Sequence, residues 1–385
     1  MRAYEACRFL VEEIGPRWIG SEGEERAGDW IETEFRRLGL ATRRLWFDCP
    51  SWDYRSTDLT VDGRHIEAGA QMFSPACAAE GELALVSPDG KGGFTGDVAG
   101  KIALLAERGT GGVLQRSKLL ANLKSTGALA AVGASGLPKT WSTKMFRDPK
   151  SDLPAAAVSG ESGAELLARP GARARLVIDA RPRPGRTSEI IGEIGLEDAP
   201  VILLGAHYDA APYSPGAEDN AAGVGLLLDL AERVRGANLA RRLRFCAFSG
   251  HEFGGDDARP FGSKSYVRDF PDELKRVELM LNFDGVGASG TTPKVGVSCP
   301  RLLERVRAWA SPERDVVVTE GPDSGSDNGV FVAAGIPAAW LQSEGARDYF
   351  AQVYHSPLDD MRWVGRSELA RSADAAFSLL SDLMK

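Results

Sequence analysis

Cysteine is scarce in this sequence, and its few cysteines show no pattern typical of a disulfide framework or a thiolate zinc site. The five are scattered and odd in number, and no C-x-x-C pair occurs among Cys7, Cys49, Cys77, Cys246 and Cys299. Long apolar runs are also missing, since none approaches the roughly 20 residues that a membrane helix needs. The first residues lack the apolar core of a signal peptide. We therefore expect a cytoplasmic protein with no membrane partner.

An excess of basic charge is the second feature that the sequence lacks. Its 46 lysines and arginines stand against 54 acidic residues, a net charge of −8, and they form no basic stripe. Nucleic acid is therefore not an expected partner. No G-x-S-x-G motif occurs, which excludes the usual serine-hydrolase elbow. The length of 385 residues and the apolar fraction of 43% favour a globular protein of two domains.

Strands and helices alternate regularly in the C-terminal half. After a Pro/Arg-rich link at 180–186, the pattern predicts strands over 201–204, 243–248, 277–283, 316–318 and 338–341, and helices over 220–234, 301–310, 328–334 and 367–384. Such alternation predicts an α/β fold with a doubly wound, mostly parallel sheet and helices on both faces. Two N-terminal helices, expected over 4–14 and 22–38, precede a strand over 42–47.

The middle of the chain differs from both ends in its pattern of predicted strands and turns. Between residues 51 and 182, short β runs are joined by turns rich in Gly, Pro and Asp, with one helix expected over 113–125. We interpret residues 51–182 as a smaller, β-rich α/β domain inserted into the catalytic domain. The catalytic domain is then discontinuous and consists of residues 1–50 and 183–385.

Metal-binding residue types follow three successive predicted strands. The first strand leads into His207-Tyr208-Asp209, the second into His251-Glu252, and the third ends at Asp284. Open α/β sheets bind ligands beyond the carboxyl ends of their strands, so these side chains are expected to lie together. Two further candidates lie in loops: Asp219, just before a predicted helix, and His355.

Five of these residues have the chemistry of a zinc centre. Zinc accepts imidazole and carboxylate ligands, and two zinc ions about 3.5–4 Å apart need a carboxylate that bridges them. The candidate ligands are His207, Asp219, Glu252, Asp284 and His355. Asp209, two residues after His207, is placed to accept the second imidazole N–H and so to orient the ring.

Several segments resemble metallopeptidase family 28, which holds di-zinc aminopeptidases and glutamate-carboxypeptidase-like enzymes. They are His207-Tyr208-Asp209, the run from Pro215 to Val224, Asn282-Phe283-Asp284 and the run from Tyr354 to Asp359. The resemblance implies two zinc ions per chain. His207 and Asp284 would hold one ion, Glu252 and His355 the other, Asp219 would bridge them, and Asp209 would orient His207. Segments 100–109, 127–132 and 153–159 resemble the protease-associated domain often inserted in zinc exopeptidases.

One residue departs from the family pattern. The family usually carries Glu-Glu where this chain has His251-Glu252, and the first of that pair is its general base. By the resemblance His251 therefore stands at the catalytic base position, and the loop over 255–261 is longer than usual. The resemblance implies a zinc-dependent exopeptidase, an aminopeptidase acting on short peptides or small amides. Two alternatives stay open, a glutaminyl-cyclase-like reaction on the same scaffold and a catalytically silent binding protein, and so does homo-oligomer formation.

Three weaker signals are set aside. The G-x-G-x-x-G run at 285–290 lacks the helix that a dinucleotide site needs. His251-Glu252 does not begin an H-E-x-x-H helix, because the fifth residue is Gly255. His65 has no companion ligands and is expected at the surface.

Tyr349 or Tyr354 is a candidate to donate a hydrogen bond to the oxyanion of the reaction, with ordinary packing as the alternative for each.

Overall fold

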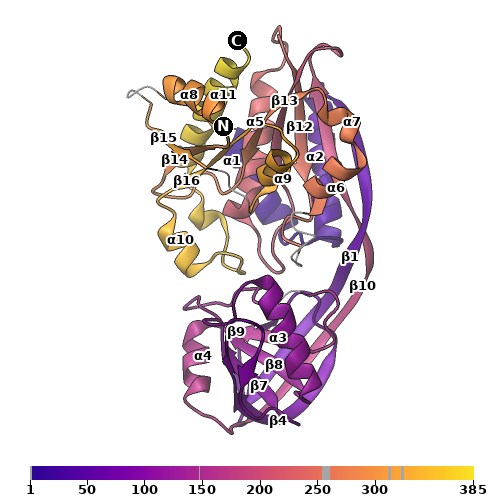
Figure 1. Ribbon diagram of the computed structural model, residues 1–385, viewed down its shortest axis with the longest axis vertical. Helices are drawn as coiled ribbons and strands as arrows, with labels where there is room; N and C mark the ends of the chain where they lie inside the picture. Colours follow the sequence, from indigo (N-terminus) through magenta and orange to yellow (C-terminus); the bar gives the residue numbers. More distant parts are fainter. Residues whose placement is uncertain (1, 147, 254–260, 311–313, 322–324) are drawn as a thin grey trace.

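A computed structural model describes residues 2–146, 148–253, 261–310, 314–321 and 325–385. Within these residues, most strands form one 14-stranded hydrogen-bonded sheet that runs through two bodies, an upper and a lower one in Figure 1. The long strands β1 (Ala41–Val61) and β10 (Arg173–Ile194) connect the bodies. None of the described helices has the length and hydropathy of a membrane span.

The upper body contains the predicted parallel sheet. Four parallel neighbours, β12-β11-β13-β16, form its centre, at Arg242–Phe248, Val201–His207, Val277–Phe283 and Ala338–Glu344. Strand β14 (Thr292–Val297) pairs antiparallel with β16, and β15 (Val317–Glu320) pairs parallel with β14. The short strand β14 follows the glycine-rich turn 285–290, so a strand and not a helix begins there.

Helices cover both faces of this sheet, as predicted. One face packs against α1 (Arg2–Arg8), α2 (Glu22–Arg37), α5 (Ala222–Arg233), α8 (Pro300–Trp309) and α11 (Arg366–Leu383). The other face packs against α6 (Phe261–Asp269), α7 (Pro271–Leu274) and α9 (Asp327–Ala333). Side chains of β11 alternate between the two cores, with Ile202 and Leu204 on one face and Val201 and Leu203 on the other. The doubly wound α/β fold is confirmed.

The predicted link at 180–186 is wrong, because these residues belong to β10. Strand β10 pairs with β1 along nearly its whole length, with β4 (Cys77–Leu85) at its start and with β12 at its end. Between those ends, β1 is its one partner among the described strands. Pro182 and Pro184 fall in this two-stranded stretch, where a residue without an N–H can face the unpaired edge. Proline in such a position therefore marks an edge rather than a linker.

The lower body is built on a second group of parallel strands, β4-β7-β8-β9, with β7 at Ile102–Ala106, β8 at Ala130–Ala134 and β9 at Ala155–Val158. Strand β3 (Ala68–Ala70) pairs antiparallel with β9 at the edge, and β2 (Arg64–Ile66) pairs antiparallel with the end of β1. A small hairpin joins β5 (Ser87–Pro88) and β6 (Phe94–Thr95), and the helices are α3 (Val113–Ser125) and α4 (Gly160–Leu167). Because β1 and β10 cross residues 50 and 182 without a break, the division into domains there stays a prediction.

Candidate metal centre

Three of the predicted ligands meet at the carboxyl end of the parallel sheet. His207 is the last residue of β11, and Asp284 follows β13 directly. Nε2 of His207 lies 3.1 Å from Oδ1 of Asp219 and 3.4 Å from Oδ1 of Asp284. This imidazole is completely buried. The strand-end argument therefore predicted that His207 and Asp284 lie close together, whereas Asp219 comes from the segment before α5.

The other two predicted ligands lie against the second oxygen of Asp219. Nε2 of His355 is 3.0 Å from Oδ2 of Asp219 and 3.2 Å from Oε1 of Glu252. Asp219 thus places one carboxylate oxygen beside each of two imidazoles. Two groups of possible metal ligands result, His207-Asp219-Asp284 and Asp219-Glu252-His355. Within each group, the ligand atoms all lie within 4.8 Å of one another.

The segment before α5 holds Asp219 in place. Asp359 accepts hydrogen bonds from the backbone N–H of Glu218 at 3.0 Å and of Asp219 at 3.3 Å. The side chain of Asn220 donates to the carbonyl of Phe283 at 2.8 Å, which ties the segment to the end of β13. Close packing of the same segment requires glycine at Gly223, because a Cβ at that position would lie 2.5 Å from the carbonyl oxygen of Phe283.

His355 has an unusual backbone conformation that a distant segment supports. Its φ is +56°, in the left-handed region that non-glycine residues rarely adopt. Its carbonyl accepts hydrogen bonds from both the backbone N–H and the Oγ1 hydroxyl of Thr143, each at 3.0 Å. Thr143 belongs to the loop between β8 and β9 in the lower body, so sequence spacing offered no signal for this contact.

Asp209 organises the loop that carries His251 and Glu252. Its carboxylate accepts the backbone N–H of His251 at 3.1 Å and that of Glu252 at 2.8 Å. For Nδ1 of His207, the backbone carbonyl of Asp209 is nearer, at 3.0 Å, than the carboxylate Oδ1, at 3.5 Å. Asp209 thus contacts the ring as predicted, and it also fixes the neighbouring loop.

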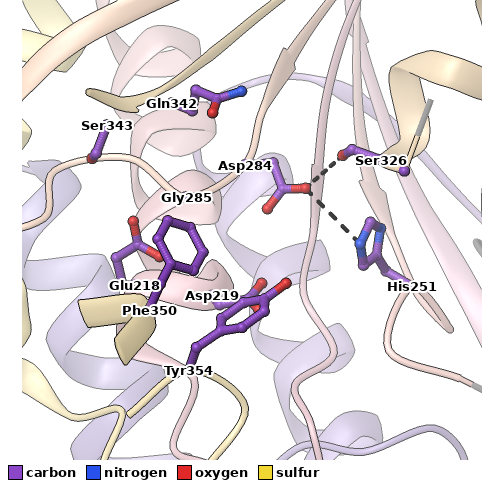
Figure 2. Close-up of a pocket in the computed structure, with 11 residues that line it drawn as sticks. Glu218, Asp219, His251, Asp284, Gly285, Ser326, Gln342, Ser343, Phe350 and Tyr354 are labelled. Carbon is purple, nitrogen blue, oxygen red and sulfur yellow. Dashed lines mark hydrogen bonds and ion pairs between the residues drawn. The ribbon is translucent and has the colours of Figure 1, made fainter. Parts of the chain in front are cut away.

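His251 is held with one ring nitrogen toward the centre. Its Nδ1 lies 3.0 Å from Oδ2 of Asp327, whose Oδ1 accepts the hydroxyl of Ser263 at 2.6 Å. The imidazole stacks on that of His207 with ring centroids 4.0 Å apart. Its Nε2 lies 3.9 Å from Oδ2 of Asp284, as Figure 2 shows. A carboxylate at Nδ1 favours a proton there, which leaves the Nε2 lone pair facing the site.

Neither Asp327 nor Ser263 was predicted from the sequence. The polar run Ser326-Asp327-Asn328 before an apolar helix is the signal that could have indicated this site. Ser326 also contacts the centre, since its hydroxyl donates to Oδ2 of Asp284 at 2.5 Å.

The electrostatics of the cluster favour a bound cation. Burial alone would lower the pKa of His207, but Asp209, Asp219 and Asp284 outweigh it and raise that pKa well above its usual value. Burial would raise the pKa of Asp284, but His207 and His251 lower it to about 2. Both shifts show that the carboxylates stabilise positive charge at this position.

The donor set also fits zinc. Nε2 of His207 is buried without a hydrogen-bond partner among the described residues, and the carboxylate oxygens of Asp219 and Asp284 face it. Buried polar atoms are almost always paired, so this nitrogen and the carboxylates facing it are explained by a cation that they coordinate. Imidazole and carboxylate are ligands that zinc accepts.

A cavity of about 310 Å³ opens beside the cluster (Figure 2). Its lining includes Asp219, Asp284 and His251 together with Glu218, Phe350 and Tyr354. Glu218 was not predicted; burial, followed by Asp359, raises the pKa of its carboxyl group well above the usual value. Tyr354 lines the cavity, whereas Tyr349 is buried and donates its hydroxyl to Asp359 at 3.1 Å.

Two remaining predictions concern positions away from the cluster. His65 is exposed, as expected, and its Nδ1 lies 3.1 Å from Oδ1 of Asp58. The long loop over 255–261 lies outside the described residues except for Phe261.

One basic side chain that the sequence did not single out reaches the cluster. Lys144, from the loop between β8 and β9, forms an ion pair with Oε2 of Glu252. Its Nζ also lies 3.2 Å from Nε2 of His355.

Comparisons with known proteins agree with this geometry. The model of peptidase family M28 matches residues 189–380. Aminopeptidase YwaD of Bacillus subtilis is 26% identical over all of this chain and 84% of its own length. Leucine aminopeptidase 2 of Trichophyton rubrum is 27% identical over 71% of this chain, which spans only 55% of that protein. The solved structure of BSAP, a zinc aminopeptidase from Bacillus subtilis, matches 100% of this chain and 95% of its own, with a TM-score of 0.82 and 25% identity.

Proposed function

The chain belongs to peptidase family M28 and is a metallopeptidase, and we propose that it removes N-terminal residues from short peptides by means of two zinc ions. The single observation that carries the proposal is the position of Asp219. Its two carboxylate oxygens lie 3.1 Å and 3.0 Å from the imidazoles of His207 and His355. A bridging carboxylate between two sets of ligands is the arrangement that two-zinc hydrolysis needs.

We assign the ligands as the family resemblance implies. His207 and Asp284 would hold the first ion, Glu252 and His355 would hold the second, and Asp219 would serve both. When bound, zinc activates a water molecule as nucleophile and polarises the scissile carbonyl. Asp209 orients His207 and the loop that carries Glu252, so both imidazole and carboxylate are preorganised.

His251 is the proposed general base. Its Nδ1 lies 3.0 Å from Asp327, which favours a proton on Nδ1, and Nε2 is the nitrogen proposed to accept the proton and pass it to the leaving amine. Asp327 and Ser263 hold the ring in this orientation. Tyr354, on the wall of the cavity, is positioned to contact the substrate backbone.

The experiment that tests the function is a substrate panel run on chelator-treated protein with and without added zinc. Aminoacyl-p-nitroanilides and dipeptides should be hydrolysed only after zinc is restored, whereas N-acetylated peptides should not be cleaved. Protein equilibrated with excess zinc should hold two ions per chain. Asp219→Asn should lose both, because asparagine offers one uncharged oxygen where two charged ones are needed.

Three outcomes would contradict the proposal. Full metal content in Asp219→Asn would show that the ligand assignment is wrong. Cyclisation of peptides with N-terminal glutamine, without hydrolysis of the panel, would identify the glutaminyl-cyclase alternative. Inactivity on every substrate with zinc bound would identify a silent binding protein.

A further inference from the structure

The loop between β8 and β9 is fixed where it meets the metal centre. Gln71 donates from Nε2 to the carbonyl of Ser142 at 3.0 Å and accepts the backbone N–H of Phe146 at 2.9 Å. Thr143 donates twice to the carbonyl of His355, each time at 3.0 Å. The backbone on either side of Lys144 is therefore anchored both to the lower body, through Gln71, and to the upper body, through His355.

Lys144 directs its ammonium group into the metal centre from this anchored backbone. The residue is only 5% exposed, and its Nζ forms an ion pair with Oε2 of Glu252. The same Nζ lies 3.2 Å from Nε2 of His355. An ammonium group has donors and no acceptor, so Nε2 of His355 must offer its lone pair to Lys144.

Lys144 and the second zinc ion compete for the same atoms. Zinc would bind Nε2 of His355 at about 2.0–2.1 Å and a carboxylate oxygen of Glu252 at about 2.0–2.2 Å. One nitrogen lone pair serves one cation at a time, and two cations at this separation repel each other. The first position differs, because no lysine or arginine in the described ranges forms an ion pair with Asp284.

We infer that Lys144 is a built-in competitor of the second zinc ion, so that the two metal positions load with unequal affinity. This inference rests on the proposed two-zinc function. The position of His207 and Asp284 fills first, and the position of Glu252 and His355 fills only when Lys144 leaves it.

The structure has room for that movement. A cavity of about 370 Å³ is lined by Lys144 itself and by Phe350, Tyr354 and His355. Because the loop backbone is anchored, displacement of the ammonium is a movement of the side chain alone. The loop between β8 and β9 in the lower body thereby controls how readily the upper body binds the second zinc ion.

The first test is a zinc titration of chelator-stripped protein in metal buffers, with bound zinc measured by elemental analysis. We expect the wild type to bind one ion at low free zinc and a second only at a concentration at least 100-fold higher. Lys144→Met keeps the length of the side chain but removes the charge. It should lower the free zinc needed for the second ion at least 10-fold and leave the first step unchanged.

The matched control is Lys139→Met, in the same loop. Lys139 is exposed, so its replacement should change neither step.

The second test needs no variant and covers the case in which Lys144→Met fails to fold. Wild-type protein is treated briefly with an amine-acylating reagent at zero, one and two zinc equivalents, and modified lysines are counted by peptide mass spectrometry. Lys144 should be protected at zero and one equivalent and should react at least fivefold faster with two. Lys139 should react equally throughout.

The outcomes separate this inference from the proposed function. Three outcomes would contradict the competition and leave the two-zinc centre intact. They are equal affinity at both positions in the wild type, an unchanged second step in Lys144→Met, and labelling of Lys144 that does not depend on zinc. A wild type that binds no zinc, or a His207→Ala variant that still binds two ions, would overturn the proposed function and this inference with it.

Discussion

At the scale of single residues, the proposed general base His251 is where this chain departs from the pattern that the family resemblance implies. An imidazole has an ordinary pKa near 6.5, which suits a general base at neutral pH. Unlike the glutamate usual in the family, it brings no negative charge, so the centre with zinc is about one unit more positive. Asp327 compensates in part, because its carboxylate lies 3.0 Å from Nδ1 of His251.

Replacing His251 should separate catalysis from metal binding. We expect His251→Ala to lower kcat roughly 10²–10⁴-fold, the usual effect of losing a general base, with unchanged zinc content. His251→Glu should restore or raise aminopeptidase activity. Steady-state kinetics beside elemental analysis checks both variants. If the wild type is inactive on every peptide and His251→Glu is active, the histidine at this position has abolished peptidase activity.

At the scale of secondary-structure elements, helix α2 contributes a buried carboxyl group beside the carboxyl end of β12. Glu24 accepts hydrogen bonds from the backbone N–H of Gly20 and from the hydroxyls of Thr187 and Ser249. Burial nevertheless raises its pKa to about 8. Helix α2 is thus joined to β10 and to the loop after β12 through one side chain.

The raised pKa of Glu24 predicts a stability that falls with rising pH. Between the ordinary pKa of glutamate, about 4.3, and about 8, the folded state binds more protons than the unfolded state. The free energy of unfolding should therefore decrease with pH, by up to about 1.4 kcal/mol per unit for one proton. Glu24→Gln should flatten this slope, because the two hydroxyls can rotate to accept from its amide.

Urea unfolding at pH 5, 6, 7 and 8 measures this slope. Glu25→Gln, at an exposed position of the same helix, is the control and should behave as the wild type. Parallel slopes for the wild type and Glu24→Gln would show that Glu24 is ionised in the folded protein.

Helices α1 and α5 pack unusually closely, which leads to a second prediction at this scale. A Cβ on Gly225 would lie 2.3 Å from the carbonyl oxygen of Ala3. Helix propensity alone favours alanine over glycine by about 1 kcal/mol. We expect Gly225→Ala to be destabilising instead, by about 1–3 kcal/mol, because the helices must separate.

Thermal unfolding of Gly225→Ala gives the sign of the effect. The control is Gly136→Ala, where the added Cβ would meet only Oε2 of Glu107, at 3.5 Å. A higher Tm for Gly225→Ala would mean that the contact between the helices yields at little cost.

At the scale of the whole molecule, the lower body forms one wall of the approach to the metal centre. Ser142 and Lys144 of that body face Phe350 and Tyr354 of the upper body across the cavity of about 370 Å³. In Figure 1 the β8–β9 side of the lower body lies below α10 (Arg347–Gln352), the helix that carries Phe350. A substrate therefore enters a space enclosed from two sides.

This enclosure predicts a preference for short peptides. Dipeptides and tripeptides should be cleaved with a higher kcat/KM than decapeptides of the same N-terminal sequence, because a long chain must pass between the two bodies. Competition assays analysed by mass spectrometry compare the lengths directly. Equal or better turnover of decapeptides or intact proteins would contradict the prediction.

Local pattern was enough to predict most elements and most of the metal cluster. Strands such as Val277–Phe283 and helices such as Val113–Ser125 were predicted with their observed bounds, because apolar periodicity and turn residues are local properties. His207, Glu252 and Asp284 could be grouped because parallel strands end at one edge of a sheet. The strand β10 was mistaken for a link at Pro182 and Pro184, since sequence does not tell which edge of a strand is unpaired.

Only the tertiary structure decided which residues from distant segments complete the site. Asp327 orients His251 from 76 positions away, and Thr143 holds the carbonyl of His355 from 212 positions away. Lys144 reaches His355 across a similar distance in sequence and is the one lysine of the described residues in contact with Glu252. The sequence by itself determined which residue types stand at the strand ends and hence the class of chemistry. The packing of one body against the other decided the charge around the candidate metal centre, because contacts between segments so far apart in sequence exist only in the folded chain.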